Sequence, residues 1–240
     1  MIYGTLFTRE DGNAAHTYGS WGMLQVGPAI VSPPKVQTKF IEVTGRDGSL
    51  DYTTALDGNV HYESRDFDVT LRCVATREEL PIIYSKILNF LHGRRLKAVC
   101  DDDQEFYWEG RFEAKKPKWN RKGYWEIDIN GTVDPYKYNT ASTLGDWLWD
   151  PFVFERDIAW DYGNIRIIDE GEIIVAASSM PTTPIFRLSA PMHMVVNNSA
   201  EYDLPKGDST IPGLVLTDKD VTLMFYGNGT VTIGFRGGSL

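Results

Sequence analysis

Apolar and polar side chains alternate with a period of two along most of this chain. The clearest run covers residues 66–73, whose apolar positions are Phe67, Val69, Leu71 and Cys73. The same alternation returns in residues 106–113 and 125–130, and Asp-rich or Gly-containing turns separate the runs. A period of two predicts strands that bury one face and expose the other. The sequence therefore predicts a chain built mainly from antiparallel β-strands.

A single segment carries the period of a helix. Thr76 and Glu79 have the spacing of a capping box, in which the side chain of each residue accepts a hydrogen bond from the backbone N–H of the other. The apolar positions that follow recur at i, i+3, i+4 and i+7, and they are Leu80, Ile83, Tyr84, Ile87, Leu88 and Leu91. This spacing predicts one helix over about residues 77–92, ended by Gly93 and packed on the sheet.

The segment around Pro135 divides the chain. Proline removes a backbone donor and disfavours regular structure before it, so we place the domain boundary between residues 1–135 and 136–240. The second part has no helical stripe, and its apolar runs are short. They cover residues 165–168, 172–176, 185–188, 194–197, 214–217, 221–225 and 230–235. Seven short strands separated by turn residues predict a β-sandwich.

The overall charge and hydropathy argue against two classes of protein, nucleic-acid-binding proteins and membrane proteins. The 240 residues include 24 basic and 33 acidic side chains, which gives a net charge of −9. Nucleic-acid binding relies on clustered Lys and Arg, so this balance argues against it. No run of about 18 apolar residues and no basic, apolar leader is present. We expect a soluble, unsecreted protein that does not insert into a membrane.

The residues that most often carry chemistry form no recognisable motif. The two cysteines, Cys73 and Cys100, lack a CxxC spacing and are expected to be buried free thiols. The four histidines match no metal-binding pattern, and no serine-nucleophile signature occurs. We therefore expect no enzyme activity, with no catalytic residue, no cofactor and no metal. The basic stretch 111–122 is expected to be neutralised by the acidic stretch 101–109 lying across a hairpin.

One constellation is not explained by core or turn patterns alone. It consists of Gly45, Arg46, Asp47, Gly48, Leu50 and Asp51, followed by Tyr62 and Arg65. Asp47-Gly48 is a turn pair. Arg46 and Arg65 lie within a few residues of Asp47, Asp51 and Asp66, so we expect each arginine to pair with a carboxylate and hold the loop.

Together with Asp134, Pro135 and Tyr136 at the boundary, these residues resemble the distal tail proteins of long-tailed siphophages. In that family a Gly-Arg-x-Gly-x-Leu/Ile-Asp segment precedes a Tyr-x-x-Arg strand, a helix, several strands and an Asp-Pro-Tyr/Phe junction. The resemblance covers about residues 20–138, while residues 139–240 match only in length and strand character. It implies a fold that is mainly β with one helix. The expected domains are an N-terminal split-barrel-like α+β domain and a C-terminal galectin-like β-sandwich.

The same resemblance implies a function. It predicts a structural virion protein that forms a homohexameric ring at the distal end of a long non-contractile tail. The implied partners are the tail tube protein, a tail-hub or tail-associated lysin protein and the tape measure protein, and DNA passes through without specific binding. The implied location is the virion tail tip, after synthesis in the host bacterial cytoplasm. We expect residues 1–135 to carry the self-assembly, because unpaired strand edges can pair with a neighbouring copy.

Two other classes of protein stay open on the residues alone. A lectin-like carbohydrate-binding module would need an aromatic platform, for which Trp147, Trp149 and Trp160 are candidates. An unrecognised glycoside hydrolase would need two carboxylates about 5 to 9 Å apart in space, and the sequence singles out no pair.

Overall fold

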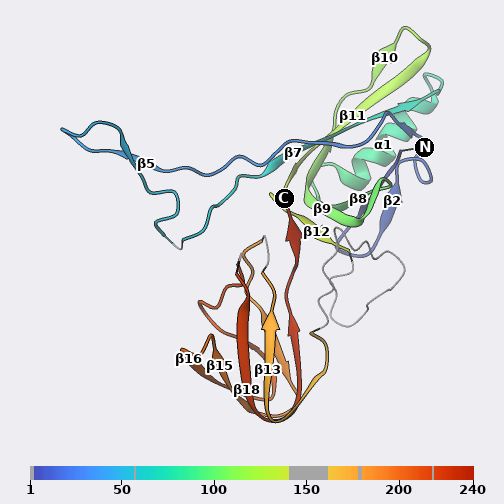
Figure 1. Cartoon of the computed structure of the whole chain (residues 1–240). Coiled ribbons are helices and arrows are strands. Elements are labelled where there is room, and N and C mark those ends of the chain that lie inside the picture. Colours follow the sequence, from blue (N-terminus) through green and yellow to red (C-terminus); the bar gives the residue numbers. More distant parts are fainter. Residues whose placement is uncertain (1–2, 57, 141–161, 178–179, 218) are drawn as a thin grey trace. The chain divides into compact units, whose positions relative to one another are not determined.

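The computed structural model describes residues 3–56, 58–140, 162–177, 180–217 and 219–240. The chain is mainly β with one helix, as the sequence predicts (Figure 1). It divides into two compact units. We call Met1–Lys137, with Leu240, the N-terminal unit and Tyr138–Ser239 the C-terminal unit.

One large antiparallel sheet and one helix make up the body of the N-terminal unit. The sheet has the strand order β2-β1-β8-β9-β11-β7-β3, with β4 also paired to β7 and β10 to β11. A second, two-stranded sheet is formed by β5 and β6. The elements are β1 Thr5–Thr8, β2 Ala14–His16, β3 Leu24–Gln25, β4 Ile30–Val31, β5 Phe40–Glu42, β6 Ser49–Asp51, β7 Arg65–Cys73, α1 Glu79–Leu91, β8 Arg95–Cys100, β9 Asp103–Ala114, β10 Lys118–Asn120 and β11 Tyr124–Val133.

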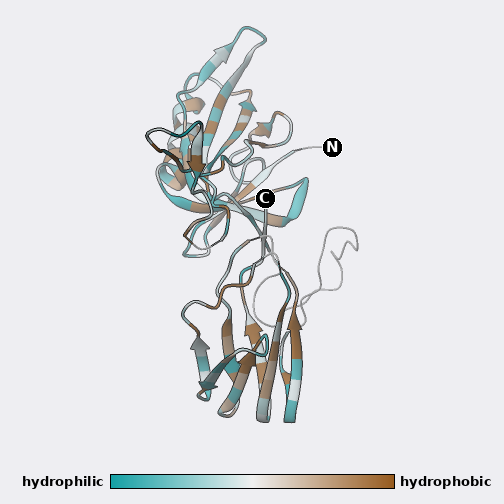
Figure 2. Ribbon diagram, turned by 60° about the vertical axis from the view of Figure 1, so that its left-hand side comes forward, coloured by the Kyte–Doolittle hydropathy of each residue, from teal (hydrophilic) through white to brown (hydrophobic). Residues whose placement is uncertain are grey.

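The period-two pattern sets which side chains enter the core. In β7 every second residue is buried, and Phe67 and Leu71 have no exposed surface. In β11 the buried positions include Ile127 and Ile129, which follow the same alternation. Figure 2 shows hydrophobic and hydrophilic residues following one another along strands of the chain. One face of the sheet therefore forms the core, and the polar residues occupy the other face.

The helix starts two residues later than the sequence predicts. Thr76 and Glu79 exchange hydrogen bonds as expected, since Glu79 Oε2 accepts from the Thr76 N–H at 2.9 Å and the Glu79 N–H donates to Thr76 Oγ1 at 3.2 Å. Residues 77 and 78 form a turn inside this exchange, so α1 begins at Glu79. The helix ends at Leu91, and Gly93 adopts a positive φ of 71° just beyond it. Three of its apolar side chains, Leu80, Ile87 and Leu91, are buried in the core.

The C-terminal unit holds a six-stranded antiparallel sheet that encloses its own core. Its strand order is β16-β15-β18-β14-β17, with β13 paired to β18. The first half of β18 pairs with β15 and the second half with β14, so this long strand joins both of them in one sheet. The elements are β12 Lys137–Asn139, β13 Ile165–Val175, β14 Ile185–Leu188, β15 Met192–Val196, β16 Ala200–Leu204, β17 Gly207–Thr210, β18 Val221–Gly234 and β19 Gly238–Ser239, with β12 paired to β19.

Several strand boundaries predicted for the C-terminal unit are wrong. The expected breaks at residues 169–171 and 226–229 lie inside β13 and β18, which pair with each other over eleven positions. Residues 214–217 make only an isolated bridge, through Leu216 to Thr182. The strands β16 and β17 were not expected.

Both thiols are free and buried, as the sequence predicts. Burial raises the pKa of Cys100 to about 12 and also raises that of Cys73. Because the thiolate is the reactive form, we expect neither cysteine to react readily with iodoacetamide at pH 8 in the native protein. Mass spectrometry should show label on both only after denaturation. Rapid labelling of the native chain would contradict this burial.

Candidate interaction surfaces

A long extended segment leaves the sheet of the N-terminal unit after β4 and returns to it at β7. We call residues 33–64 the arm (Figure 1). Its two runs pair near the base, where the Gln37 N–H donates to His61 O at 2.8 Å, and again in the hairpin of β5 and β6. None of the described residues from Ser32 to Ser64 is buried.

The arm exposes apolar side chains that the described part of the chain does not cover. Phe40 is 59% exposed and Leu56 is 93% exposed. Further large apolar residues of the arm with exposed side chains are Val36, Ile41, Val43, Tyr52 and Val60. A two-stranded hairpin is only marginally stable alone in water, and a concentration of exposed apolar surface marks an interaction site. The arm thus has the character of a segment that binds another surface.

The first half of the predicted motif forms the tip of the arm. Gly45 and Gly48 have positive φ values of 82° and 75°, which allows the sharp turn between β5 and β6. Arg46 makes no ion pair with any residue that the structure describes, so its expected pairing with a carboxylate is wrong. Asp51 accepts a hydrogen bond from the Thr53 N–H at 2.8 Å, and hydrogen bonds from Thr53 lower the pKa of this carboxyl group.

The second half of the motif gathers at the base of the arm. Arg65 is buried, and its guanidinium donates to the carbonyl oxygens of Ser32 and of Pro135, the latter at 3.3 Å. The same group lies 4.6 Å from the ring centroid of Trp108. The rings of Tyr62 and Tyr136 meet edge to face, with centroids 6.0 Å apart.

The arginine at the base ties together three segments that are remote in sequence. The expected partner was a carboxylate, and this was wrong: among the described residues the contacts are two carbonyls and an indole. Carbonyl oxygens suit a partly buried guanidinium because they accept hydrogen bonds without bringing a second charge that must lose its water. Asp134, next in the motif, accepts from Arg95 at 2.7 Å.

Arg65→Ala is expected to destabilise the N-terminal unit by about 1–3 kcal/mol, because it leaves two partly buried carbonyls without their donor. Calorimetry of the full chain would measure this as a lower melting temperature of one unit. Lys at this position should not restore stability, since an ammonium cannot bridge both carbonyls and lie flat on Trp108. Arg46→Ala is the matched control and should leave the melting temperature unchanged. Equal effects of the two alanine variants would contradict a tether at the base.

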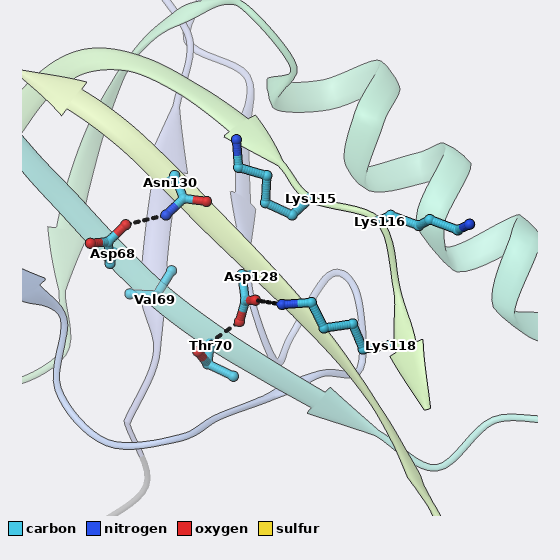
Figure 3. A pocket seen from close by; sticks show the side chains of 8 residues that line it. All are labelled: Asp68, Val69, Thr70, Lys115, Lys116, Lys118, Asp128 and Asn130. Carbon is cyan, nitrogen blue, oxygen red and sulfur yellow. Dashed lines mark hydrogen bonds and ion pairs between the residues drawn. The ribbon is translucent and has the colours of Figure 1, made fainter. Parts of the chain in front are cut away.

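The outer face of β7, β9 and β11 is polar and its charges are compensated locally. Figure 3 shows a shallow hollow on this face, in which Asp128 accepts from Lys118 at 2.8 Å and from Thr70 at 2.9 Å, and Asn130 donates to Asp68. Burial raises the pKa of Asp128, but the hydrogen bonds from Lys118 and Thr70 outweigh it and the pKa is lowered overall. We call this surface the polar sheet face.

The ion pairs continue across the rest of the polar sheet face. Arg72 pairs with Glu126 at 2.8 Å, and Lys115 pairs with Glu113. Its charged residues are Asp66, Asp68, Arg72, Arg111, Glu113, Lys115, Lys118, Glu126 and Asp128. Acidic and basic groups are thus nearly balanced, and the face presents no strong potential of either sign.

The basic stretch has a different setting from the one expected. Residues 101–109 lie at the far end of β9, where Asp103 pairs with Lys137 at 2.8 Å and Glu109 with Arg95 at 3.0 Å. They therefore do not neutralise the basic residues, and that expectation was wrong. Residues 115–124 form a projecting hairpin made of the loop after β9, strand β10, a turn and the first residue of β11 (Figure 1). We call them the basic hairpin.

The described residues were also compared with the requirements of a metal site and of a membrane-spanning helix. No group of His, Cys, Asp and Glu there could hold a metal ion. No helix there combines the length and apolar character that crossing a bilayer requires. The candidate lectin platform of Trp147, Trp149 and Trp160 lies outside the described residues.

Comparison with known proteins gives a likeness in structure but none in sequence families. No family model and no curated protein matches this chain. Among solved structures, the chain is similar to the Dit (gp 19.1) protein of SPP1, described as a paradigm of hub adsorption apparatus in phages that infect Gram-positive bacteria. The TM-score is 0.58 at 14% sequence identity, and the likeness covers 100% of both chains. The two proteins share a fold, and the predicted fold class is confirmed.

Proposed function

We propose that this chain is a structural virion protein that forms a hexameric ring at the distal end of a long non-contractile phage tail. The observation that carries the proposal is the fold shared with the SPP1 Dit hub protein over the whole length of both chains. In this position the ring joins the tail tube protein to a tail-hub or tail-associated lysin protein and surrounds the end of the tape measure protein. Its role is mechanical, with no catalytic step.

The arm supports self-assembly of the N-terminal unit. It exposes Phe40, Ile41 and Val43 on a hairpin. This hairpin makes no hydrogen bond to any described residue outside the arm. A contact between different surfaces of two copies forms a ring when the rotation from each copy to the next closes. An arm that leaves one copy and binds the next supplies such a contact.

The polar sheet face supports passage of DNA without tight binding. Counterion release makes unpaired Lys and Arg side chains bind phosphate strongly at low salt. On this face Lys115 and Lys118 are already paired with Glu113 and Asp128. If the face lines the central channel, a duplex meets a wall that is close to neutral and slides past it.

The native mass of the purified full-length chain tests the proposal. We expect a six-fold species by native mass spectrometry and a ring in negative-stain images. A protein that stays monomeric at every accessible concentration and binds glycans on an array would overturn the ring and favour a lectin-like module. Hydrolysis of a generic glycoside would instead indicate an enzyme.

A further inference from the structure

We propose that the arm of one copy binds the basic hairpin of the next copy. The proposal rests on the ring described above and names the two surfaces that form its interface. Both surfaces belong to the N-terminal unit, and both are exposed in the single chain. Their apolar and charged groups are complementary.

The basic hairpin presents a fixed aromatic surface. Trp119 on β10 lies opposite Trp125 on β11, and the two rings meet edge to face with centroids 4.9 Å apart. Trp125 is held in place because its Nε1–H donates to Ala75 O at 3.1 Å. Trp119 is nevertheless 55% exposed. Tryptophan is among the residues that contribute most to protein interfaces, and a ring already held in position loses little entropy on binding.

Some of the cations of the basic hairpin have no partner within the described part of the chain. The segment has five basic residues and no acidic one. Lys115 and Lys118 pair with carboxylates of the polar sheet face. The side chains of Lys116, Arg121 and Lys122 have no hydrogen-bond or ion-pair partner among the residues that the structure describes. Three cations therefore lie within three residues of the exposed Trp119.

The arm carries the complementary groups. It has three basic and five acidic residues, so its net charge is 3 − 5 = −2. Around its tip, Glu42 and Asp47 lie near the exposed Phe40, Ile41 and Val43. The hydrogen bonds of residues 38–56 that involve described residues all stay within the arm. Its outward side chains are thus available to another molecule, where Phe40 and Val43 can pack on Trp119 and the carboxylates can pair with Arg121 and Lys122.

The arm is also long enough to reach a neighbouring copy. From Pro33 to Gly45 an extended chain spans about 40 Å at roughly 3.3 Å per residue. The radius of gyration expected for a compact unit of this size is about 14 Å. The tip therefore extends past the edge of its own unit and can reach the surface of a molecule beside it.

Nucleic acid is the main competing occupant of the basic hairpin, since cations around an exposed aromatic ring also bind single strands. The adjoining polar sheet face offers phosphates little further attraction, because Lys115 and Lys118 already pair with Glu113 and Asp128. An acidic, apolar protein segment meets the same cations with far less charge. The second copy of this chain is accordingly the occupant that we propose.

A charge-exchange experiment on the full-length chain tests the inference. The triple variant Lys116→Glu/Arg121→Glu/Lys122→Glu is expected to weaken ring formation at least tenfold by mass photometry. Adding Glu42→Lys and Asp47→Lys to the same chain should restore a large part of it, because the reversed charges attract again. The matched control is Arg166→Glu/Lys206→Glu/Lys219→Glu, which reverses three exposed cations of the C-terminal unit and should leave assembly unchanged.

The outcomes separate the inference from the proposed function. If the wild-type chain forms rings and the triple variant forms them equally well, the docking surface is wrong while the ring stands. If the wild-type chain is always monomeric, both are wrong. If a labelled single-stranded or duplex oligonucleotide binds the wild-type hairpin, and the triple variant loses this binding but still assembles, the occupant is nucleic acid.

Cross-linking gives a second readout that does not depend on affinity. A photoreactive benzoyl-phenylalanine in place of Phe40 should cross-link to a peptide containing residues 116–125, and the product should have twice the mass of the chain. The same group in place of the exposed Ile82, on α1, is the control. Cross-links from position 40 that map only to other segments would overturn the inference.

Discussion

Replacement of Phe112 by alanine is expected to lower the free energy of unfolding of the N-terminal unit by about 3–5 kcal/mol, which is typical of a large aromatic residue lost from a core. Phe112 is 1% exposed and meets Phe7 and Phe67 edge to face at 5.2 and 5.4 Å between ring centroids. Removing the ring leaves a cavity between two strands and loses both aromatic contacts. Urea denaturation and, separately, calorimetry of the full chain would measure the loss of unfolding free energy.

The control for this variant is Glu113→Ala. Glu113 is the next residue of the same strand but points to the opposite, exposed face, where its pair with Lys115 contributes little. Its replacement should change stability by no more than about 0.5 kcal/mol. Similar losses for both variants would show that Phe112 is not a core residue.

Gly131 leaves the space in which the large rings of Phe67 and Phe112 pack. It lies opposite Phe67 on one side and Phe112 on the other. A Cβ atom there would come within 2.6 Å of the Phe112 ring, so the ring occupies the space that a side chain would need. Gly131→Ala is therefore destabilising in the wild-type chain. Its cost should fall when Phe112 is shortened to leucine, and a double-mutant cycle would measure this coupling.

The elements that the sequence predicts well are those whose burial depends on local pattern. Strand β7 and helix α1 each bury one face against the sheet core, so the period of their apolar residues is the period of the element itself. A Gly-containing turn was also expected between the alternating runs 106–113 and 125–130, and residues 121–123, which follow Asn120 and include Gly123, form one.

The strands of the C-terminal unit show where local pattern fails. Gly227, Asn228 and Gly229 are typical turn residues, yet they lie within β18. Opposite them, Asp169 has a φ of 64°, and the two irregular stretches pair with each other. The same residue types occur in a turn and in a distortion shared by two paired strands. The two cases can be told apart only from the partner strand, which lies some 60 residues away in the sequence.

Predicting the interaction surfaces would have required the topology of the chain as well as the sequence motif. The residues from Gly45 to Arg65 were identified from sequence, but the sequence could not show that they divide between the tip and the base of an arm. Phe40, Ile41 and Val43 have the composition of a core strand. Whether such a strand is buried by its own chain or by another is a property of the assembly. Arg65 was expected to have a nearby carboxylate, whereas its contacts come from Ser32, Trp108 and Pro135.

Removal of the arm is expected to abolish self-assembly while leaving the N-terminal unit folded. The structure suggests where to cut, because Val36 bridges Tyr62 and the Gln37 N–H bonds to His61 O. Replacing residues 38–60 with Asn-Gly joins Gln37 to His61 through a two-residue turn suited to antiparallel strands. No described residue in the deleted range is buried, so the core loses nothing.

The shortened chain should unfold at the temperature of the wild-type protein and run as a monomer by native mass spectrometry. A subtler variant, Phe40→Ser/Ile41→Ser, should weaken assembly without changing chain length, since it removes apolar area that the neighbouring copy would bury. Leu56→Ser provides a comparison, because Leu56 is more exposed but lies outside the β5–β6 hairpin. If the shortened chain still forms rings, the contacts between copies come from the body of the sheet, and the exposed residues of the arm serve a partner other than this chain.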